Sequence, residues 1–381
     1  MKIDDKKSLK SPSLRFPEFT GEWKNTTLEE CVDFLDGQRK PIKSDDRKGE
    51  KRLYPYYGAS GIIDYIDEYI FDGDYILLSE DGANIIDRNY RVAFIANGKI
   101  WVNNHAHVLQ PHKEMNINFL SEALERINYA IYNTGTTMPK LNQEICRKIN
   151  LNVPSLSEQN KIGNLLYLLN ERIATQNRLI EDLKKLSCAI VEKMFKQSKT
   201  NGRLGDFIEQ VSVRNKNGLY SNVLSVSNKQ GFVKQSEQFE DRTVASEDTS
   251  NYKIVKRNNF AYNPARINVG SIARLTKFDV GIVSPMYVCF RTKDGIIPEY
   301  MEAFFTSQQF FYEMMKRLEG SVRLCLSYEG LCNIPVYIPN MNKQIVMGQN
   351  ISLILSKIGL EIEYLGRLHQ QKQYLLRKMF I

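Results

Sequence analysis

The sequence of 381 residues lacks several features that mark common protein classes. Its six cysteines (Cys31, Cys146, Cys188, Cys289, Cys325 and Cys332) form no CxxC pair and show no even spacing. This favours reduced thiols in a cytosolic protein over a disulfide framework. No run of 18 apolar residues occurs, so we expect no membrane-spanning helix. The segment MKIDDKKSLKSPS has no apolar core and does not predict a secretory signal.

The chain also lacks the motifs of common enzymes. GxGxxG, GxxxxGK[ST], HExxH and GxSxG are all absent. His105 and His107 alternate on a predicted strand, with His112 nearby, but a metal site needs a third or fourth converging ligand. Glu80 and Asp81 predict a turn, because neighbouring strand residues point to opposite faces and do not form a carboxylate pair. We therefore expect no catalytic residue and no metal in this chain.

Charge permits nucleic-acid binding without establishing it. The 52 basic and 44 acidic residues give a net charge of +8, with a pI near 8.9. Residues 15–157 carry a net charge of −4, so any polyanion-binding face there must be local. One candidate is the segment 39–52, which holds seven basic and three acidic residues.

One internal repeat organises the chain. Residues 135–195 align with residues 320–380 without a gap, and 13 of the 61 positions are identical. The identities include Gly135 with Gly320, Gln159 with Gln344, Gly163 with Gly348, and Lys193-Met194-Phe195 with Lys378-Met379-Phe380. The repeat predicts a pseudo-two-fold order of globular region, long helix, globular region and long helix.

Each repeat ends in a heptad pattern. The seam residues are Ile162, Leu166, Leu169, Ile173, Gln176, Ile180, Leu183, Ser187, Ile190 and Met194, and then Met347, Ile351, Ile354, Ile358, Glu361, Leu365, Leu368, Lys372, Leu375 and Met379. Eight of ten positions are apolar in each set, and the polar ones fall at the same places. The pattern predicts two long helices that form a coiled coil, each about 36 residues and roughly 54 Å long.

The direction of this helix pair is open from the sequence. An antiparallel pair with Gln176 opposite Lys372 and Ser187 opposite Glu361 matches all polar seam residues, one heptad away from flush ends. A parallel pair in register also matches polar with polar. We take the antiparallel register as our hypothesis. Two core helices in separate domains are the alternative, which the length of the heptad pattern disfavours.

The globular regions have a mixed α/β pattern. Strand-like runs are RLYPYYGAS, YIFDGDYILLS, RVAFIANGKIWV and HAHVL in the first, and NVLSVSN, NNFAYN, GSIARLT and IVSPMYVCFR in the second. Helices are predicted over 118–132 and about 298–317, followed by the loops NTGTTMPKL and EGSVRLCL. The predicted fold class is α+β, with two mixed α/β domains separated by two long helices.

Polar and aromatic residues gather at the predicted turns of both regions. Arg and Lys read guanine, Asn and Gln read adenine, and Ser and Thr reach phosphates. The candidates for DNA contact are Arg88, Arg91, Asn103, Asn104, His105, Thr136, Thr137 and Lys140 in the first region, and Tyr262, Asn263, Arg266, Asn268, Ser284, Tyr287, Ser321 and Arg323 in the second. Each residue alone also fits a solvated loop or a turn.

Several phrases resemble a known family. GASGIIDYIDEYIFDGDYILLSEDGAN, NPARINVGSI, VSPMY, and GTTMPKLNQEICRKINLNVPSLSEQNKI leading into the heptad helix resemble target-recognition domains of the specificity subunit of type I restriction–modification enzymes. The resemblance runs from Leu14 to Phe380, and the order of the phrases makes it specific. It implies a first recognition domain at 1–157, a conserved helix at 158–199, a second recognition domain at 200–342 and a second conserved helix at 343–381.

The resemblance also implies a mechanism. Each recognition domain would read half of a split, asymmetric sequence in double-stranded DNA, and the antiparallel coiled coil would fix the distance between the halves. Two methylation subunits would dock on the chain and carry S-adenosylmethionine. Two restriction subunits with ATP and Mg²⁺ can join them, so no cofactor is expected on this chain. The family pattern maps the recognition loops onto Thr136, Thr137, Lys140, Ser321 and Arg323, with Asn263, Arg266, Ser284 and Tyr287 from the NPAR and VSPMY segments. The expected location is the cytoplasm, without a membrane.

Two rival functions remain. A non-catalytic coiled-coil scaffold that binds protein partners predicts no dependence on DNA sequence. A single-chain adenine methyltransferase needs an [ND]PP[YF] motif and a cofactor pocket. The nearest match, Asn263-Pro264-Ala265-Arg266, lacks the second proline and the aromatic residue, and no catalytic constellation supports this rival.

Overall fold

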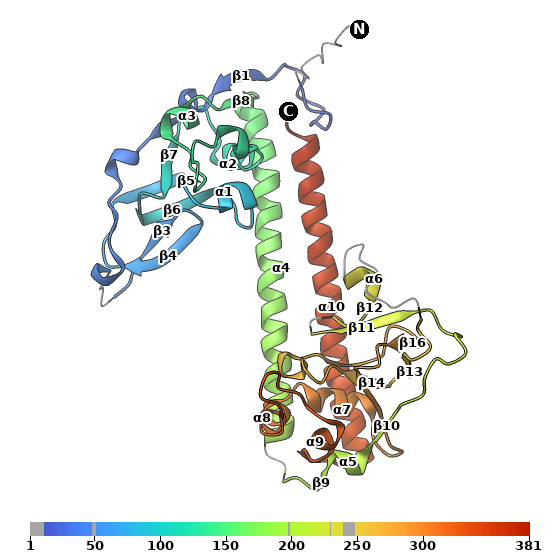
Figure 1. Ribbon diagram of the computed structural model, residues 1–381. Coiled ribbons are helices and arrows are strands. Elements are labelled where there is room, and N and C mark those ends of the chain that lie inside the picture. The colour runs from blue at the N-terminus through green and yellow to red at the C-terminus, as the bar shows by residue number, and fades with distance from the viewer. Residues whose placement is uncertain (1–10, 48–50, 197–198, 229, 239–247) are drawn as a thin grey trace. The chain divides into compact units, whose positions relative to one another are not determined.

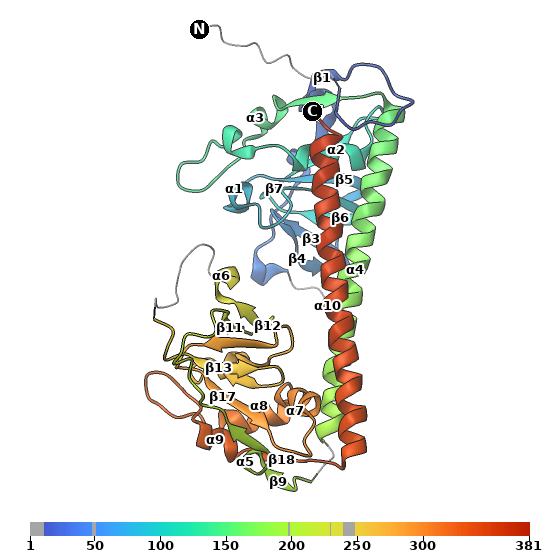
Figure 2. The ribbon, with the colours of Figure 1, turned by 90° about the vertical axis from the view of Figure 1, so that its right-hand side faces the viewer.

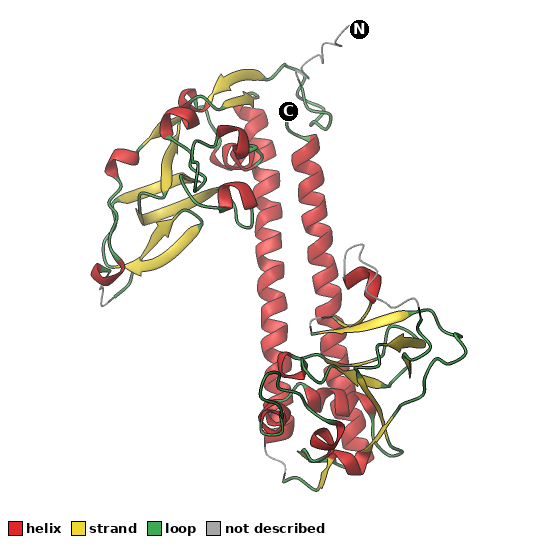
Figure 3. Ribbon diagram, in the orientation of Figure 1, coloured by secondary structure: helices red, strands yellow, loops and turns green. Residues whose placement is uncertain are grey.

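The computed structural model describes residues 11–47, 51–196, 199–228, 230–238 and 248–381 (Figure 1). The chain divides into two compact units. The first unit comprises residues 1–177 and 364–381, and the second comprises residues 178–363. Each unit mixes helices and strands (Figure 3), which confirms the α+β class. Both units take part of each long helix, whereas the predicted boundaries treat the helices as separate segments.

The first unit begins with strands and ends on a long helix. Its elements are β1 (Lys24–Thr27), β2 (Val32–Phe34), β3 (Tyr54–Gly58), β4 (Gly61–Ile66), β5 (Phe71–Ser79), α1 (Asn84–Asp87), β6 (Ala93–Val102), β7 (Ala106–Pro111), α2 (Ile117–Glu125), α3 (Gln143–Arg147), β8 (Asn150–Val153) and the start of α4 (Leu156–Lys196). The four strand-like runs of the sequence correspond to β3, β5, β6 and β7. The helix predicted over 118–132 ends earlier, at Glu125, and a separate 3₁₀ turn follows at Tyr129–Tyr132, capped by the Asn128 side chain.

A six-stranded sheet in the order β2-β7-β5-β6-β3-β4 forms the frame of the first unit. Its neighbouring strands are antiparallel except β3 and β6, which are parallel. Ile76 and Leu78 of β5 enter the core that contains Leu120 and Leu124 of α2. Leu77 enters a different core, because successive strand residues point to opposite faces. Both faces of β5 are therefore covered.

The second unit contains two four-stranded sheets. Its elements are β9 (Gly202–Arg203), α5 (Leu204–Phe207), β10 (Ile208–Gln210), β11 (Val223–Ser227), β12 (Gly231–Lys234), α6 (Gln235–Gln238), β13 (Lys253–Lys256), β14 (Phe260–Tyr262), β15 (Ile272–Arg274), β16 (Val280–Val283), β17 (Val288–Thr292), α7 (Pro298–Phe305), α8 (Gln308–Met315), α9 (Tyr328–Cys332), β18 (Pro335–Val336) and the start of α10 (Met341–Lys378). The sheets run β10-β17-β14-β15 and β12-β11-β16-β13. The helix predicted over 298–317 is two helices, because the Ser307 side chain accepts a hydrogen bond from Phe310 N and caps α8.

The predicted heptad seams are the inward stripes of α4 and α10. Every seam residue is buried or half-buried, including the polar Gln176, Ser187, Glu361 and Lys372. In the first unit the start of α4 shares a core with the end of α10, and Figures 1 and 2 both place these two helix ends beside each other. In the second unit the end of α4 shares a core with the start of α10. Both groupings favour an antiparallel direction, and the coiled coil itself stays a prediction.

The structure does not support the predicted register. Ile162 and Leu166 share one core with Leu375 and Met379. This grouping fits helices with flush ends and does not fit a stagger of one heptad. Lys372, expected opposite Gln176, instead extends its Nζ to 3.1 Å from Glu122 Oε1 on α2. A salt bridge to the globular part thus explains why this seam position is a lysine.

A repeated contact fixes each long helix to its own globular part. Buried Gln159 on α4 accepts a hydrogen bond from Asn116 N and donates to Glu114 O and Pro154 O. The repeat-equivalent Gln344 on α10 accepts from Ile297 N and donates to Gly295 O and Pro339 O. One turn later, a Cβ on Gly163 or Gly348 would lie too close to the backbone that starts α2 or α7. The repeat identities therefore mark the junction between helix and domain.

α10 is the one described helix that is long and apolar enough to cross a membrane. An 18-residue window in it has a mean hydropathy of 1.3 and is 22% buried. The sequence-based exclusion of such a helix was therefore too strict. Core helices of soluble proteins pass the same test, and α10 packs into a core at both ends.

Candidate nucleic-acid interface

Each unit carries a short loop closed by backbone hydrogen bonds. In the first unit Thr134 N donates to Lys140 O at 2.9 Å. In the second unit Glu319 and Cys325 exchange two hydrogen bonds of 2.9 and 2.8 Å. These two closing pairs occupy equivalent positions in the repeat. The loop tips are therefore equivalent, and we name them tip 1 (135–139) and tip 2 (320–324).

Both tips depend on their first glycine. A Cβ on Gly135 would overlap the Met138 carbonyl oxygen, and a Cβ on Gly320 would overlap the Arg323 carbonyl oxygen. Gly320 also has φ +115°, a conformation that L residues rarely adopt. In both units the chain turns back on itself three residues after the glycine, although the tips share no other residue.

The two tips expose different chemistry. Thr136 and Thr137 are exposed in tip 1, and Ser321 and Arg323 are exposed in tip 2. Each tip adds an apolar side chain, Met138 at 60% and Val322 at 94% exposure. Hydroxyls bond bases or phosphates, a guanidinium bonds guanine, and apolar groups contact the thymine methyl. The tips can thus contact DNA in the same geometry with different base preferences.

A buried histidine supports the base of tip 1. His107 is 1% exposed, with Nδ1 at 2.6 Å from Asp36 Oδ2 and Nε2 at 2.8 Å from Leu141 O. Burial lowers the pKa of His107, but hydrogen bonds with Asp36 and Cys146 outweigh it and raise the pKa to about 10. The ring is therefore a cation that donates from both nitrogens. No pattern in the sequence indicated that Asp36 would be its partner.

The turn predicted at Glu80 and Asp81 is a second support for tip 1. Lys140 Nζ lies 3.5 Å from Glu80 Oε1, and Arg39 Nη1 lies 2.7 Å from Glu80 Oε2. Asp81 pairs with His105 Nδ1 at 2.9 Å. The structure thus brings Lys140 and His105 to the same edge of the first unit.

The arginines of the basic segment 39–52 make contacts within the first unit, whereas Lys40, Lys43 and Lys51 are exposed. Arg39 is engaged with Glu80, and the Arg47 guanidinium lies 4.5 Å from the centre of the Tyr56 ring. Arg52 is 3.7 Å from Asp64 Oδ1. Residues 48–50 lie outside the described part of the chain. The described arginines of this segment are therefore committed to contacts within the unit.

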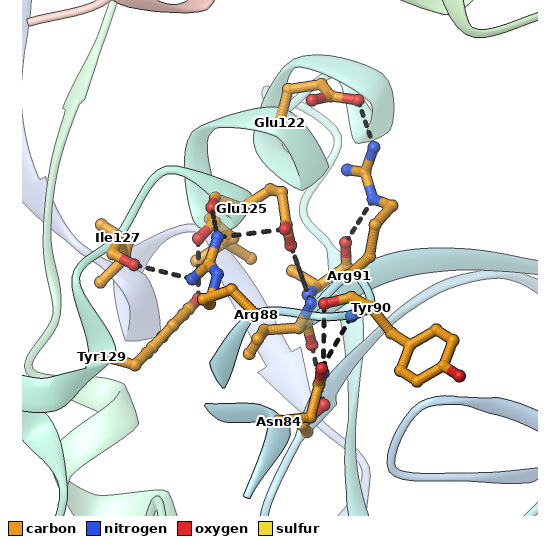
Figure 4. Close-up of polar contacts among 12 residues, drawn as sticks. Asn84, Arg88, Tyr90, Arg91, Glu122, Glu125, Ile127 and Tyr129 are labelled. Atoms are coloured by element: carbon orange, nitrogen blue, oxygen red, sulfur yellow. Dashed lines mark hydrogen bonds and ion pairs between the residues drawn. The ribbon is translucent and has the colours of Figure 1, made fainter. Parts of the chain in front are cut away.

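Arg88 and Arg91 serve the fold of the first unit (Figure 4). Arg88 donates to Ile127 O and pairs with Glu125 at 3.1 Å. Arg91 Nη1 lies 2.6 Å from Glu122 Oε1, and Arg91 Nε donates to Ala93 O. Their predicted role in DNA contact does not fit this arrangement, because both guanidinium groups are directed at α2. The position of Arg88 and Arg91 near a predicted turn does not indicate that their partners lie on α2 and just after it.

The remaining candidates of the first unit differ in exposure. Asn104 is exposed, and His105 keeps 51% of its side chain exposed beside Asp81. Asn103 is only 5% exposed, and its Oδ1 accepts a hydrogen bond from His105 N. Asn103 therefore shapes the turn and does not reach the surface.

In the second unit the NPAR and VSPMY residues come together. Asn263, Arg266, Ser284 and Tyr287 line one small cavity. Pro264 O accepts a hydrogen bond from Leu326 N, which attaches the base of tip 2 to the same region. Asn268 is half-buried nearby in the turn Ile267–Val269.

Tyr262 is a correction to the predicted set. Its side chain is fully buried, and its hydroxyl donates to Leu326 O at 3.2 Å. It cannot contact DNA, but it holds the chain that follows tip 2. Phe260 and Ala261 precede it in the short buried strand β14, and this apolar run was the signal in the sequence for its burial.

The described residues contain no group of three or more His, Cys, Asp or Glu side chains that could hold a metal ion. His105 and His107 pair with different carboxylates, Asp81 and Asp36, and do not converge. All six cysteines are free thiols.

The comparisons with known proteins agree with this architecture. Residues 20–185 match the model of the type I restriction modification DNA specificity domain. A putative type I restriction enzyme specificity subunit of Haemophilus influenzae is 35% identical over 145 residues, which is 38% of this chain and 36% of the relative. The type I restriction enzyme EcoprrI specificity subunit of Escherichia coli is 29% identical over 154 residues, 40% of this chain and 37% of the relative. The matched parts thus cover well under half of each relative.

The fold match covers more of the chain. The crystal structure of the S subunit of a type I restriction–modification system from M. genitalium has a TM-score of 0.69, with 17% identity, over 97% of this chain and 99% of that one. At this identity the likeness concerns the fold. Fold and domain match together define a protein with a type I DNA specificity domain. The sequence match places a type I restriction modification DNA specificity domain at residues 20–185, and the likeness over the whole chain is one of fold.

Proposed function

We propose that the chain is the non-catalytic subunit that selects the DNA sequence in a type I restriction–modification complex. Each unit reads one half of a split, asymmetric double-stranded site, and the two long helices set the distance between the halves. One observation carries this proposal. The chain presents two loops of equivalent geometry, tip 1 and tip 2, with different exposed side chains.

The partners follow from the same proposal. Two methylation subunits dock on the chain and carry S-adenosylmethionine, and two restriction subunits with ATP and Mg²⁺ can join them in the cytoplasm. This chain holds no cofactor of its own. Residues 15–157 carry a net charge of −4, so the methylation subunits supply most of the phosphate contacts. The chain alone should bind DNA weakly, with a small dependence on salt.

Co-expression with a methylation subunit of a type I system from the same organism tests the function. Single-molecule sequencing of the host DNA should reveal methyladenine in one asymmetric split motif. A complex that forms without any new methylation, or with methylation independent of sequence, would instead favour a scaffold that binds only proteins. The chain expressed alone is the control and should leave the DNA unmodified.

A further inference from the structure

The second unit contains a small cavity whose lining includes four of the predicted DNA-contact residues, Asn263, Arg266, Ser284 and Tyr287. Its volume is about 230 Å³. Ser225 on β11 contributes one wall, Asn263 and Arg266 after β14 contribute the second, and Ser284 after β16 contributes the third. The cavity is thus formed where three separate segments of one unit meet.

Polar groups in the cavity wall are available to a ligand. Gln235 Oε1 is buried and has no hydrogen-bond partner among the described residues. Ser225, which is 6% exposed, adds its hydroxyl to the same wall. Asn263 Oδ1 accepts from Ala265 N at 3.1 Å, which leaves the Asn263 amide group free to donate. Buried polar groups are costly unless they are hydrogen-bonded, so this wall suits a ligand with donors and acceptors along its edge.

The other walls are apolar. Leu224, Val226 and Tyr287 are 1%, 5% and 8% exposed. The Tyr287 hydroxyl accepts a hydrogen bond from Val226 N at 3.3 Å, which fixes the ring. A cavity of about 150 Å³ holds benzene, so this larger cavity has room for a heterocycle of one or two rings.

These features discriminate between ligands. A phosphate group has no apolar face to bury, and Arg266 is the single cation among the lining residues. A planar ring with a polar edge satisfies both kinds of wall. A nucleobase has this shape, and enzymes that extrude a base hold it by hydrogen bonds to its edge and by contact with its faces.

We propose that this cavity holds one nucleobase extruded from the second half of the DNA site. The inference rests on the proposed function, because the base belongs to the DNA that the chain recognises. Extrusion costs a few kcal/mol of stacking and pairing, which the contacts in the cavity offset. The extruded base differs from the adenine that is methylated, whose methyl donor lies on the partner subunit.

The test uses the assembled methyltransferase and its split site. DNA duplexes carry the fluorescent base 2-aminopurine at one position of the second half at a time. We expect fluorescence to rise several-fold on binding at one position other than the methylated adenine. Replacement of that nucleotide by an abasic site should preserve or strengthen binding, because no base pair then has to open.

Two variants connect the signal to the cavity. Ser225→Leu fills the cavity and should remove the signal, with a loss of affinity of roughly 10- to 100-fold at the second half. Ser212→Leu is the matched control on an exposed site of the same unit and should retain the signal. If Ser225→Leu does not fold, Ser225→Ala removes only the hydroxyl and should weaken the signal.

The outcomes separate this inference from the function on which it rests. Sequence-specific methylation without a fluorescent signal at any second position would overturn the inference alone. A signal unchanged in Ser225→Leu would do the same. Free adenosine or cytidine that binds the complex while DNA gives no signal would mean that the cavity serves a free nucleoside. Absence of all sequence-specific binding would overturn both proposals.

Discussion

His107 Nδ1 lies 2.6 Å from Asp36 Oδ2, while Nε2 of the same ring lies 2.8 Å from Leu141 O. This buried ring on β7 connects the turn that follows β2 to the end of the loop that carries tip 1. Asp36 is held in the ionised form. Burial raises the pKa of Asp36, but the hydrogen bond and charge of His107 outweigh this effect and lower it. The pair is therefore charged at neutral pH.

We expect His107→Gln to destabilise the first unit in a pH-dependent way. The pKa of His107 is about 10 in the folded chain, against an ordinary value of 6.5. The protonated ring therefore stabilises the fold fully below pH 6.5, and the contribution disappears as the pH rises through 10. The difference in unfolding free energy between wild type and variant should shrink by about 1.4 kcal/mol per pH unit over that range. Denaturant unfolding from pH 6 to 10 measures it. A constant difference would show that the ring is neutral.

Gly135→Ala and Gly320→Ala should each damage one half of the recognition. Either Cβ would overlap the carbonyl oxygen three residues later, so the tip must open. We expect methylation to lose specificity at the first half in Gly135→Ala and at the second half in Gly320→Ala. The added strain at Gly320 is roughly 1–2 kcal/mol, because its φ is positive. Gly37→Ala and Gly359→Ala are controls, since a Cβ at these positions meets nothing within 4 Å. If one variant damaged both halves equally, the proposal that each unit reads its own half of the site would be contradicted.

Arg323→Ala should change base preference at the second half only. The Arg323 side chain is exposed and makes no ion pair with the described residues. Loss of one bidentate base contact costs about 1–3 kcal/mol, or roughly 10- to 100-fold in affinity. Competition binding with single-base variants of the site measures the change. Arg257→Ala is the control, because Arg257 is exposed in the same unit but pairs with Asp279. An equal loss of both halves would exclude a local role for Arg323.

Glu122→Gln should loosen the junction between α2 and the long helices. Glu122 Oε1 lies 2.6 Å from Arg91, 2.8 Å from Asn170 and 3.1 Å from Lys372. Burial raises the pKa of Glu122, but the charges of Arg91 and Lys372 outweigh it and lower the pKa. Removal of the Glu122 charge should lower the free energy of unfolding by about 2–3 kcal/mol at pH 7.

This cost should fall as the pH drops below the ordinary glutamate value of 4.5, because the wild-type carboxylate is then protonated in the unfolded chain. Thermal unfolding at pH 7 and at acid pH measures the difference. Glu171→Gln, an exposed change on α4, is the control and should cost little. A cost that does not depend on pH would show that packing, and not charge, makes the contribution.

Two of the repeat identities lie at the junctions between the long helices and the globular parts. Identity of Gln159 with Gln344 and of Gly163 with Gly348 was visible in the sequence, but their role at the helix–domain junction was not. The glutamine side chain satisfies three backbone groups at once there, and two of the three come from chain segments 43 to 49 residues away. Only the folded chain shows which groups need a partner.

The sequence by itself determined the order of the elements, the inward stripe of α4 and α10, and the equivalence of the two loops. These properties follow from local periods, turn residues and an ungapped repeat, which act over short stretches of chain. Tertiary structure alone decided which polar residues are free. Arg88 and Arg91 pair with α2, and Tyr262 is in the core, whereas Arg323 stays exposed. The physical reason is that the partner of a charged group or a hydroxyl often lies far away in the sequence. A local sequence pattern therefore does not show which polar side chains are paired.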